Sequence, residues 1–227
     1  LEILIGRINK SRCIDSILIA TTKRKEDDAI VRLAKKLGVA YFRGSRDNVL
    51  KRFIDASKTL GANVIVRATA DNPLTDPGLT DELIKIHLKR KVEYTYCVGA
   101  PLGIAVEIIN QKTLEKIYSL TKYPLYREHV TLYIKDYPEQ FKVKTVRAEN
   151  FDLNYVDIRL TVDTKEDLKL MRKLNKNLGC LADLNIKEVI RYLNLHPQIK
   201  EINAKVRQRV PKINKKVTVI VLSLIHI

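Results

Sequence analysis

One stretch of the sequence, residues 63–74, decides the fold: NVIVRATADNPL. Its first half is a short apolar run, as expected of a buried strand, and it leads directly to Asp71 and to Pro73, which ends the strand. A carboxylate at the carboxyl end of a strand lies where open α/β sheets bind their ligands. A turn without a ligand is the competing interpretation, because Asp, Asn and Pro all favour turns.

A second stretch, residues 159–168, repeats this pattern with the sequence RLTVDTKEDL. An apolar strand again ends on an aspartate, and a helix begins at once. Taken alone, Asp163 or Thr164 is most simply the N-cap of that helix. Taken together, Asp71 and Asp163 are hard oxygen ligands at strand ends of one sheet, and these suit Mg²⁺ with phosphate and water completing its coordination. The pair predicts a metal-dependent reaction at phosphorus, of the nucleotidyl-transfer class.

Apolar runs alternate with amphipathic segments along most of the chain. This alternation predicts a mainly parallel sheet covered by helices on both faces. The predicted strands are residues 16–21, 39–42, 63–68, 93–98, 105–110, 141–146 and 158–162. The predicted helices are residues 1–12 (the end of a helix), 26–37, 47–60, 77–89, 112–120, 125–137, 165–175 and 186–195.

A loop before the helix at residues 47–60 is a candidate nucleotide site. It contains Arg43, Gly44 and Ser45. The glycine permits close approach of the backbone, and the amides that follow can receive a phosphate, ribose or base. A loop with a capped helix explains the same residues equally well.

Two other groups of residues are candidates for the acceptor site. Arg127 and His129 lie together in YREHVT, where a neutral histidine can act as a base, a ligand or a hydrogen-bond donor. A surface salt bridge explains this group about as well. Gly103 lies in a loop before the strand that bears Glu107, which is the weaker of the two signals.

The chain is strongly basic, with 42 Lys and Arg against 26 Asp and Glu and a net charge of +16. A nucleic-acid-binding module is therefore an alternative. We favour general lysine enrichment, or a surface suited to a nucleoside triphosphate, because the sequence has no zinc-ligand spacing, helix-turn-helix signature or aromatic-rich binding strand. A metal-dependent glycosyltransferase is a third alternative. It would carry an Asp-x-Asp motif, and Pro73 stands where the second aspartate belongs.

The composition of the chain indicates in which cellular compartment the protein is expected. Hydrophobic residues make up 45% of the 227 residues, which is ample for a buried core. No run approaches the ~18–20 apolar residues of a membrane span, and residues 1–12 lack the pattern of a signal peptide. Cys13, Cys97 and Cys180 are too few and too far apart for a disulfide framework or a zinc site. We therefore expect a cytoplasmic protein without a membrane partner.

The order of these motifs resembles that of the cytidylyltransferase family, which includes CMP-Kdo and CMP-sialic acid synthetases, and in particular its spore coat polysaccharide biosynthesis protein F branch. The resemblance extends over residues 1–175 and rests on five stretches in register. They are IATT at 19–22 with Asp27 and Asp28, FRGS at 42–45 with VL at 49–50 and RF at 52–53, RATADNPL at 67–74, REHVT at 127–131, and TVDT at 161–164 with EDL at 166–168.

The resemblance implies a three-layer α/β/α Rossmann-like nucleotidyltransferase fold, of the nucleotide-diphospho-sugar transferase kind. The implied reaction joins CTP to a sugar or sugar acid, giving a CMP-sugar for surface polysaccharide or glycan synthesis and requiring Mg²⁺. A homodimer is expected. By the family's pattern, Asp71 and Asp163 are the catalytic metal ligands. The nucleotide-binding residues are Arg43, Gly44, Ser45 and Arg67. The sugar-binding residues are Gly103, Glu107, Arg127 and His129.

Both ends of the chain depart from the family's pattern. The family opens with a strand and a Gly-x-x-Arg-x-Pro-Gly-Lys-like loop that cradles the triphosphate, and no stretch of this sequence matches it. We therefore expect the chain to begin after that loop, to leave a sheet edge unpaired and to be unable to turn over CTP. The expected domain spans residues 1–195, with a basic linker at 196–216 and the start of another segment at 217–227. Residues 222–227, LSLIHI, match a translated sequencing adapter and are expected to be non-native.

Overall fold

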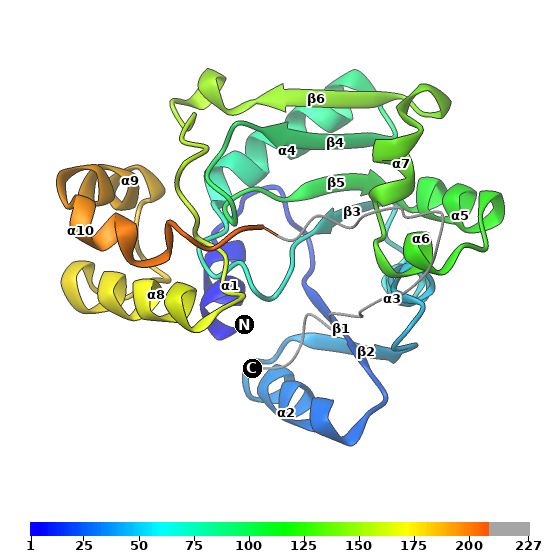
Figure 1. Cartoon of the computed structure of the whole chain (residues 1–227). Helices are drawn as coiled ribbons and strands as arrows, with labels where there is room; N and C mark the ends of the chain where they lie inside the picture. The colour runs from blue at the N-terminus through cyan, green and yellow to red at the C-terminus, as the bar shows by residue number, and fades with distance from the viewer. Residues whose placement is uncertain (209–227) are drawn as a thin grey trace.

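The computed structural model of the chain describes residues 1–208, in which helices surround two sheets (Figure 1). The strands are β1 (Leu18–Thr22), β2 (Ala40–Gly44), β3 (Val64–Arg67), β4 (Tyr94–Val98), β5 (Glu107–Asn110) and β6 (Val143–Arg147). The α-helices are α1 (Glu2–Ile8), α2 (Asp28–Lys36), α3 (Val49–Thr59), α4 (Pro77–Arg90), α5 (Gln111–Leu120), α6 (Pro124–Glu128), α7 (Leu132–Asp136), α8 (Lys165–Leu178), α9 (Ile186–Leu195) and α10 (Pro197–Lys200). Short 3₁₀ turns are η1 (Lys25–Asp27), η2 (Pro138–Gln140), η3 (Ala148–Phe151) and η4 (Glu201–Asn203).

The larger sheet has the strand order β3-β5-β4-β6. β5 pairs antiparallel with β3 and with β4, whereas β4 and β6 are parallel, so β5 alone runs against the other strands of this sheet. β1 and β2 pair in parallel as a separate sheet, and no ladder joins β1 to β3 in residues 1–208. The mixed, mainly parallel α/β architecture predicted from the sequence is confirmed.

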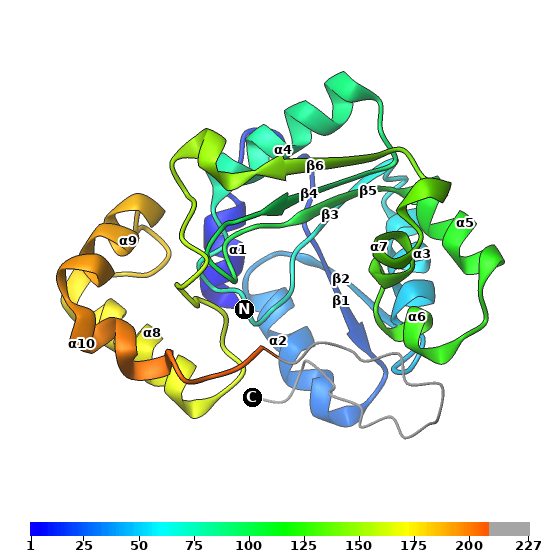
Figure 2. The ribbon, with the colours of Figure 1, turned by 45° about the horizontal axis from the view of Figure 1, so that its top comes forward.

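Helices cover both faces of the larger sheet. Ile108 of β5 lies in a core that includes Leu83 of α4, while its neighbour Ile109 packs in a second core with Leu50 of α3 and Leu114 of α5. Successive strand residues point to opposite faces, so these two cores make three layers. Figure 2 shows α8, α9 and α10 grouped beyond the left-hand ends of the strands of this sheet, and α3, α5, α6 and α7 grouped toward the right-hand ends.

Local capping fixes the helices that flank the candidate site. Asp76 accepts the Leu79 amide at 2.7 Å, and Pro77 occupies the first turn of α4. Thr164 and Asp167 form a capping box at the start of α8. The loops that follow β3 and precede α8 therefore end at defined points.

The helix predicted at residues 125–137 is wrong as a single element, because it is two short helices, α6 and α7. The backbone leaves the helical region at His129 (φ −96°, ψ 85°). Just beyond this break, the Thr131 hydroxyl donates to the Glu107 carboxylate at 3.0 Å. A buried acceptor thus redirects a segment whose sequence pattern favours one helix.

The strand predicted at residues 158–162 is also wrong. The segment makes one isolated bridge, between Arg159 and Leu102. The amide of Val162 then donates to the carbonyl of Asp71 at 2.8 Å. Ile158 and Leu160 are buried and Val162 is partly buried, but the backbone of the segment bonds to two loops and not to a neighbouring strand.

The linker predicted from residue 196 begins too early. α10 buries Ile199, and Asn203 in η4 is buried against α8, where it donates to Asp167 at 2.7 Å. The folded domain therefore extends at least to Asn203. The segment predicted at residues 217–227 lies outside the described residues. No helix within residues 1–208 has the length and apolar character needed to cross a membrane.

Candidate active site

The turn after β3 holds Asp71 against the segment that carries Asp163. The carbonyl of Asp71 accepts the Val162 amide at 2.8 Å and the Thr161 hydroxyl at 3.3 Å. Asp163 is the next residue along, so this backbone tether places the two predicted metal ligands on adjoining loops. Side-chain atom Oδ1 of Asp71 is buried and has no hydrogen-bond partner within residues 1–208.

The electrostatics of Asp71 show that the two aspartates interact. Burial raises the pKa of the Asp71 carboxyl, and the negative charge of Asp163 raises it further. A hydrogen bond from Thr69 and the positive charge of Arg67 oppose this shift but do not cancel it. A buried carboxylate oxygen without a partner costs free energy, and a bound cation would remove that cost.

Asp163 is exposed and is held by Arg159. The Arg159 guanidinium bridges Asp163 and the fully buried Asp167, with 2.9 Å between Nε and the Asp167 carboxylate. Asp167 also accepts the backbone amides of Asp163 and Thr164, each at 3.0 Å. Arg159 and the buried Asp167 therefore hold the turn that carries Asp163, while the Asp163 carboxylate itself stays accessible. Sequence reasoning gave Arg159 no role in the site and used Asp167 as part of a stretch that resembles the family.

Gly103 packs against the backbone of the segment that leads to Asp163. Its φ is +100°, and a Cβ there would lie 2.6 Å from the Thr161 nitrogen and 2.7 Å from the Leu160 carbonyl carbon. Next to it, Leu102 donates to Ile158 at 3.0 Å. Only glycine fits this close approach. Gly103, expected near the sugar, thus contacts the backbone that leads to Asp163.

A second cluster surrounds Glu107, at the start of β5. Its carboxylate accepts from Arg67 at 2.7 Å, Lys135 at 2.6 Å, the Tyr94 hydroxyl at 2.7 Å and the Thr131 hydroxyl at 3.0 Å. Burial alone would raise the pKa of Glu107, but the positive charges of Arg67 and Lys135 outweigh burial and lower it to about 2. Glu107 is therefore ionised and fully engaged.

Arg67 links this cluster to the aspartates. It pairs with Glu107 across the β3–β5 register. Its positive charge opposes the upward pKa shift that burial gives Asp71 and adds to the downward pKa shift that burial gives His129. Its Nε is buried and has no partner within residues 1–208. The pKa of the half-buried His129 is lowered chiefly by burial, so the imidazole is neutral at physiological pH.

Three predicted residues, Arg67, Glu107 and His129, are thus brought together next to Asp71. Sequence reasoning missed Lys135, Tyr94 and Thr131, which complete the cluster. The one available sequence signal was the four-residue spacing of Thr131 and Lys135, which places two residues on the same face of a helix.

The predicted nucleotide loop forms a separate group at the end of β2. Arg43 donates to the carbonyls of Thr22 at 2.8 Å and Arg24 at 2.6 Å, and it pairs with Asp28 at 2.7 Å. Ser45 accepts the Asn48 amide at 3.0 Å. In this structure these side chains fix the loop between β1 and α2 and the start of α3.

Gly44 and Arg127 have local packing roles as well. A Cβ on Gly44 would lie 2.8 Å from Cγ of Arg52. The Arg127 guanidinium lies 3.4 Å from the Tyr118 ring centroid and donates to the Tyr118 carbonyl at 2.7 Å. Arg127 is therefore directed at α5 and makes none of the contacts that join Arg67, Glu107 and Lys135.

A family model covers this whole arrangement. It is described as cytidylyltransferase and matches residues 1–209. The chain belongs to the cytidylyltransferase family. The resemblance seen in the motifs, and the nucleotidyltransferase class that it implies, are confirmed by this match.

Relatives of this cytidylyltransferase match most of its length. An uncharacterised protein of Methanocaldococcus jannaschii is 44% identical over 209 residues, covering 92% of this chain and 85% of that protein. Spore coat polysaccharide biosynthesis protein SpsF of Bacillus subtilis is 37% identical over 203 residues, covering 87% and 84%. The solved structure of a cytidylyltransferase from Leptospira borgpetersenii superposes with a TM-score of 0.83 at 28% identity, covering 93% and 87%.

The aspartates of this cytidylyltransferase fit a hard divalent cation. Residues 1–208 contain no group of three or more His, Cys, Asp or Glu side chains that could enclose a metal. Two carboxylates suffice where phosphate and water oxygens supply the remaining ligands, as Mg²⁺ commonly requires. The partnerless Oδ1 of Asp71 and the accessible carboxylate of Asp163 are suitable donors.

Proposed function

We propose that the site around Asp71 and Asp163 is where CTP and Mg²⁺ bind in this cytidylyltransferase, for the family's activation of a sugar or sugar acid as a CMP-sugar with release of pyrophosphate. The observation that carries the proposal is the buried, partnerless carboxylate oxygen of Asp71, tethered beside Asp163. The family match supports CTP as the nucleotide. A role in surface polysaccharide or glycan synthesis is supported by the similarity to SpsF, whose name refers to a spore coat polysaccharide.

Asp71 and Asp163 would hold the metal. A bound Mg²⁺ neutralises phosphate charge and orients an in-line displacement at phosphorus. In the proposed reaction a sugar oxygen forms a bond to the α-phosphorus of CTP, and the bond to the departing pyrophosphate breaks. Arg67, between the aspartates and Glu107, adds positive charge on the side of the acceptor.

The acceptor sugar would bind at the Glu107 cluster. Glu107 holds Arg67 and Lys135 in fixed positions, and neutral His129 beside them can either donate or accept a hydrogen bond. Such a mixed set suits the hydroxyl groups of a sugar. A sugar-binding role for Gly103 and Arg127 remains a prediction. A nucleotide-binding role for Arg43, Gly44, Ser45 and Arg67 remains a prediction as well. A homodimer and a cytoplasmic location are proposed on the family resemblance alone.

Calorimetry tests the proposed function. The protein is titrated with CTP in Mg²⁺ and, separately, in EDTA. We expect CTP binding to require Mg²⁺ and to weaken at least about tenfold in Asp71→Asn, which corresponds to about 1.4 kcal/mol or more. Asp183→Asn is the matched control, because Asp183 is exposed and forms an exposed ion pair with Lys10. CTP binding that is equal in EDTA, or unchanged in Asp71→Asn, would overturn the proposal.

A further inference from the structure

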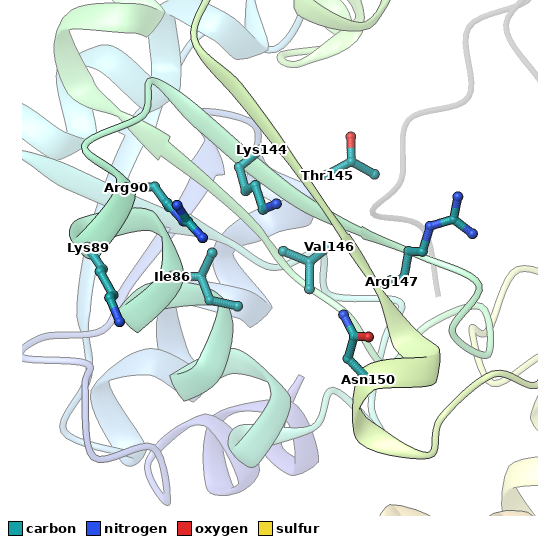
Figure 3. Close-up of a pocket in the computed structure, with 8 residues that line it drawn as sticks. All are labelled: Ile86, Lys89, Arg90, Lys144, Thr145, Val146, Arg147 and Asn150. Atoms are coloured by element: carbon teal, nitrogen blue, oxygen red, sulfur yellow. The ribbon is translucent and has the colours of Figure 1, made fainter.

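A cavity lies between the last turn of α4 and β6, at the edge of the larger sheet (Figure 3). Its volume is about 420 Å³. Ile86 and Val146 form its apolar part, and Lys89, Arg90 and Lys144 provide positive charge. Cavities of this size commonly hold a small molecule.

The charge in this cavity is uncompensated. Lys89, Arg90 and Lys144 form no ion pair within residues 1–208, and Figure 3 labels all three among the residues that line the cavity. The acidic residues nearby are already engaged. Glu149 pairs with Arg147 at 3.7 Å, and Glu93 receives Lys116 and the amide of Lys142.

Ordinary structural roles explain single cations here but not the set. Lys89 and Arg90 are in the last turn of a helix, where positive charge is favourable. Lys144 is on an edge strand, where lysine discourages pairing with another chain. Neither role accounts for three unpaired cations around a cavity with an apolar wall. The edge lysine also argues against docking of an extended peptide, which leaves a compact anion as the better occupant.

We propose that the α4–β6 cavity binds a multiply charged phosphate group, either as pyrophosphate or as the phosphate chain of a nucleotide. The site is separate from the aspartate pair. β3, which leads to Asp71, and β6 are at opposite edges of the four-stranded sheet, three strand spacings or about 14 Å apart. The proposal therefore does not depend on the proposed reaction.

The test is a titration of ¹⁵N-labelled protein with pyrophosphate and, separately, with CTP at low ionic strength, followed by amide chemical shifts. We expect pyrophosphate to shift the amides of Ile86, Arg90 and Val146. Removal of one screened charge at contact distance weakens binding about fivefold, so the triple variant Lys89→Gln, Arg90→Gln, Lys144→Gln should bind on the order of a hundredfold more weakly. Added salt should weaken binding to the native protein.

The matched control removes the same number and kind of charges from α8. Arg172, Lys173 and Lys176 are exposed and form no ion pair within residues 1–208, so their replacement by Gln should leave binding at the cavity unchanged. Equal weakening in both triple variants would show only a general charge effect and overturn the proposal, as would shifts confined to residues elsewhere. If CTP shifts the Ile86 amide signal further than pyrophosphate does, the cavity binds a nucleotide. If both ligands give the same amide shifts, the cavity recognises the phosphate group alone.

Discussion

Glu107→Gln should destabilise the protein strongly at neutral pH and much less in acid. The Glu107 side chain is 15% exposed and receives four donors, two of them cationic. The pKa of this carboxyl falls from 4.5 to about 2 on folding. Each unit of pKa shift corresponds to 1.36 kcal/mol, so ionised Glu107 contributes about 3 kcal/mol at pH 7.

The sign follows from the direction of the shift. A carboxyl whose pKa is lowered by folding contributes its full stability above the unfolded pKa, and this stability is lost as the pH falls through the folded pKa. The difference between native protein and Glu107→Gln should therefore be about 3 kcal/mol from pH 5 to 7 and shrink between pH 4.5 and 2.

Urea unfolding at a series of pH values measures this difference. Glu115→Gln is the control, because Glu115 forms an exposed pair with Lys58 at 2.7 Å, and solvent screening leaves such a pair with little effect on stability. A destabilisation of Glu107→Gln that is the same at every pH would refute the electrostatic reasoning. A difference at pH 7 no larger than that of Glu115→Gln would refute it as well.

Three further substitutions test the framework of the aspartate pair. Asp71→Asn should stabilise the metal-free protein at pH 7, because folding raises the pKa of this carboxyl and its ionised form is unfavourable above that pKa. Thermal unfolding in EDTA measures this, and a loss of stability would contradict it. Gly103→Ala should lower the free energy of unfolding in urea more than Gly179→Ala, since both glycines have positive φ but only at Gly103 would a Cβ meet neighbouring backbone. Equal losses, each roughly 1–3 kcal/mol from backbone strain, would contradict a role for the close approach at Gly103. Asn203→Ala should lower the free energy of unfolding by about 1–3 kcal/mol, because buried Asp167 loses a hydrogen-bond donor, whereas Asn177→Ala breaks only an exposed hydrogen bond to Tyr192 and should have little effect. Similar unfolding midpoints for the two variants would contradict the role of Asn203 in holding Asp167.

Local signals predicted most elements well. The helix predicted at residues 77–89 is α4, Pro77–Arg90, because Asp76 and Pro77 form a start signal that depends on neighbouring residues alone. The strand at 63–68 is β3, Val64–Arg67, for a similar reason: a short apolar run ends at turn residues. Such features need no knowledge of the rest of the chain.

The candidate site could be predicted only in part. Asp71 and Asp163 were visible because each follows an apolar run, but the contact between their loops depends on Val162, which lies far from Asp71 in sequence. Lys135 is 28 residues from Glu107, and periodicity gives no sign of their ion pair. The apolar alternation at 158–162 reports burial correctly, yet burial does not determine whether a segment pairs as a strand.

The most direct test of the central claim is where a divalent metal binds. Mn²⁺ is added to ¹⁵N-labelled protein as a paramagnetic substitute for Mg²⁺, and the broadening of each amide signal is measured. We expect Asn72 and Thr164, which flank the two aspartates, to broaden first, excess Mg²⁺ to reverse the effect, and Asp71→Asn to abolish it. Broadening centred on other carboxylates, or equal broadening in Asp71→Asn, would contradict the assignment of Asp71 and Asp163 as the metal-binding pair.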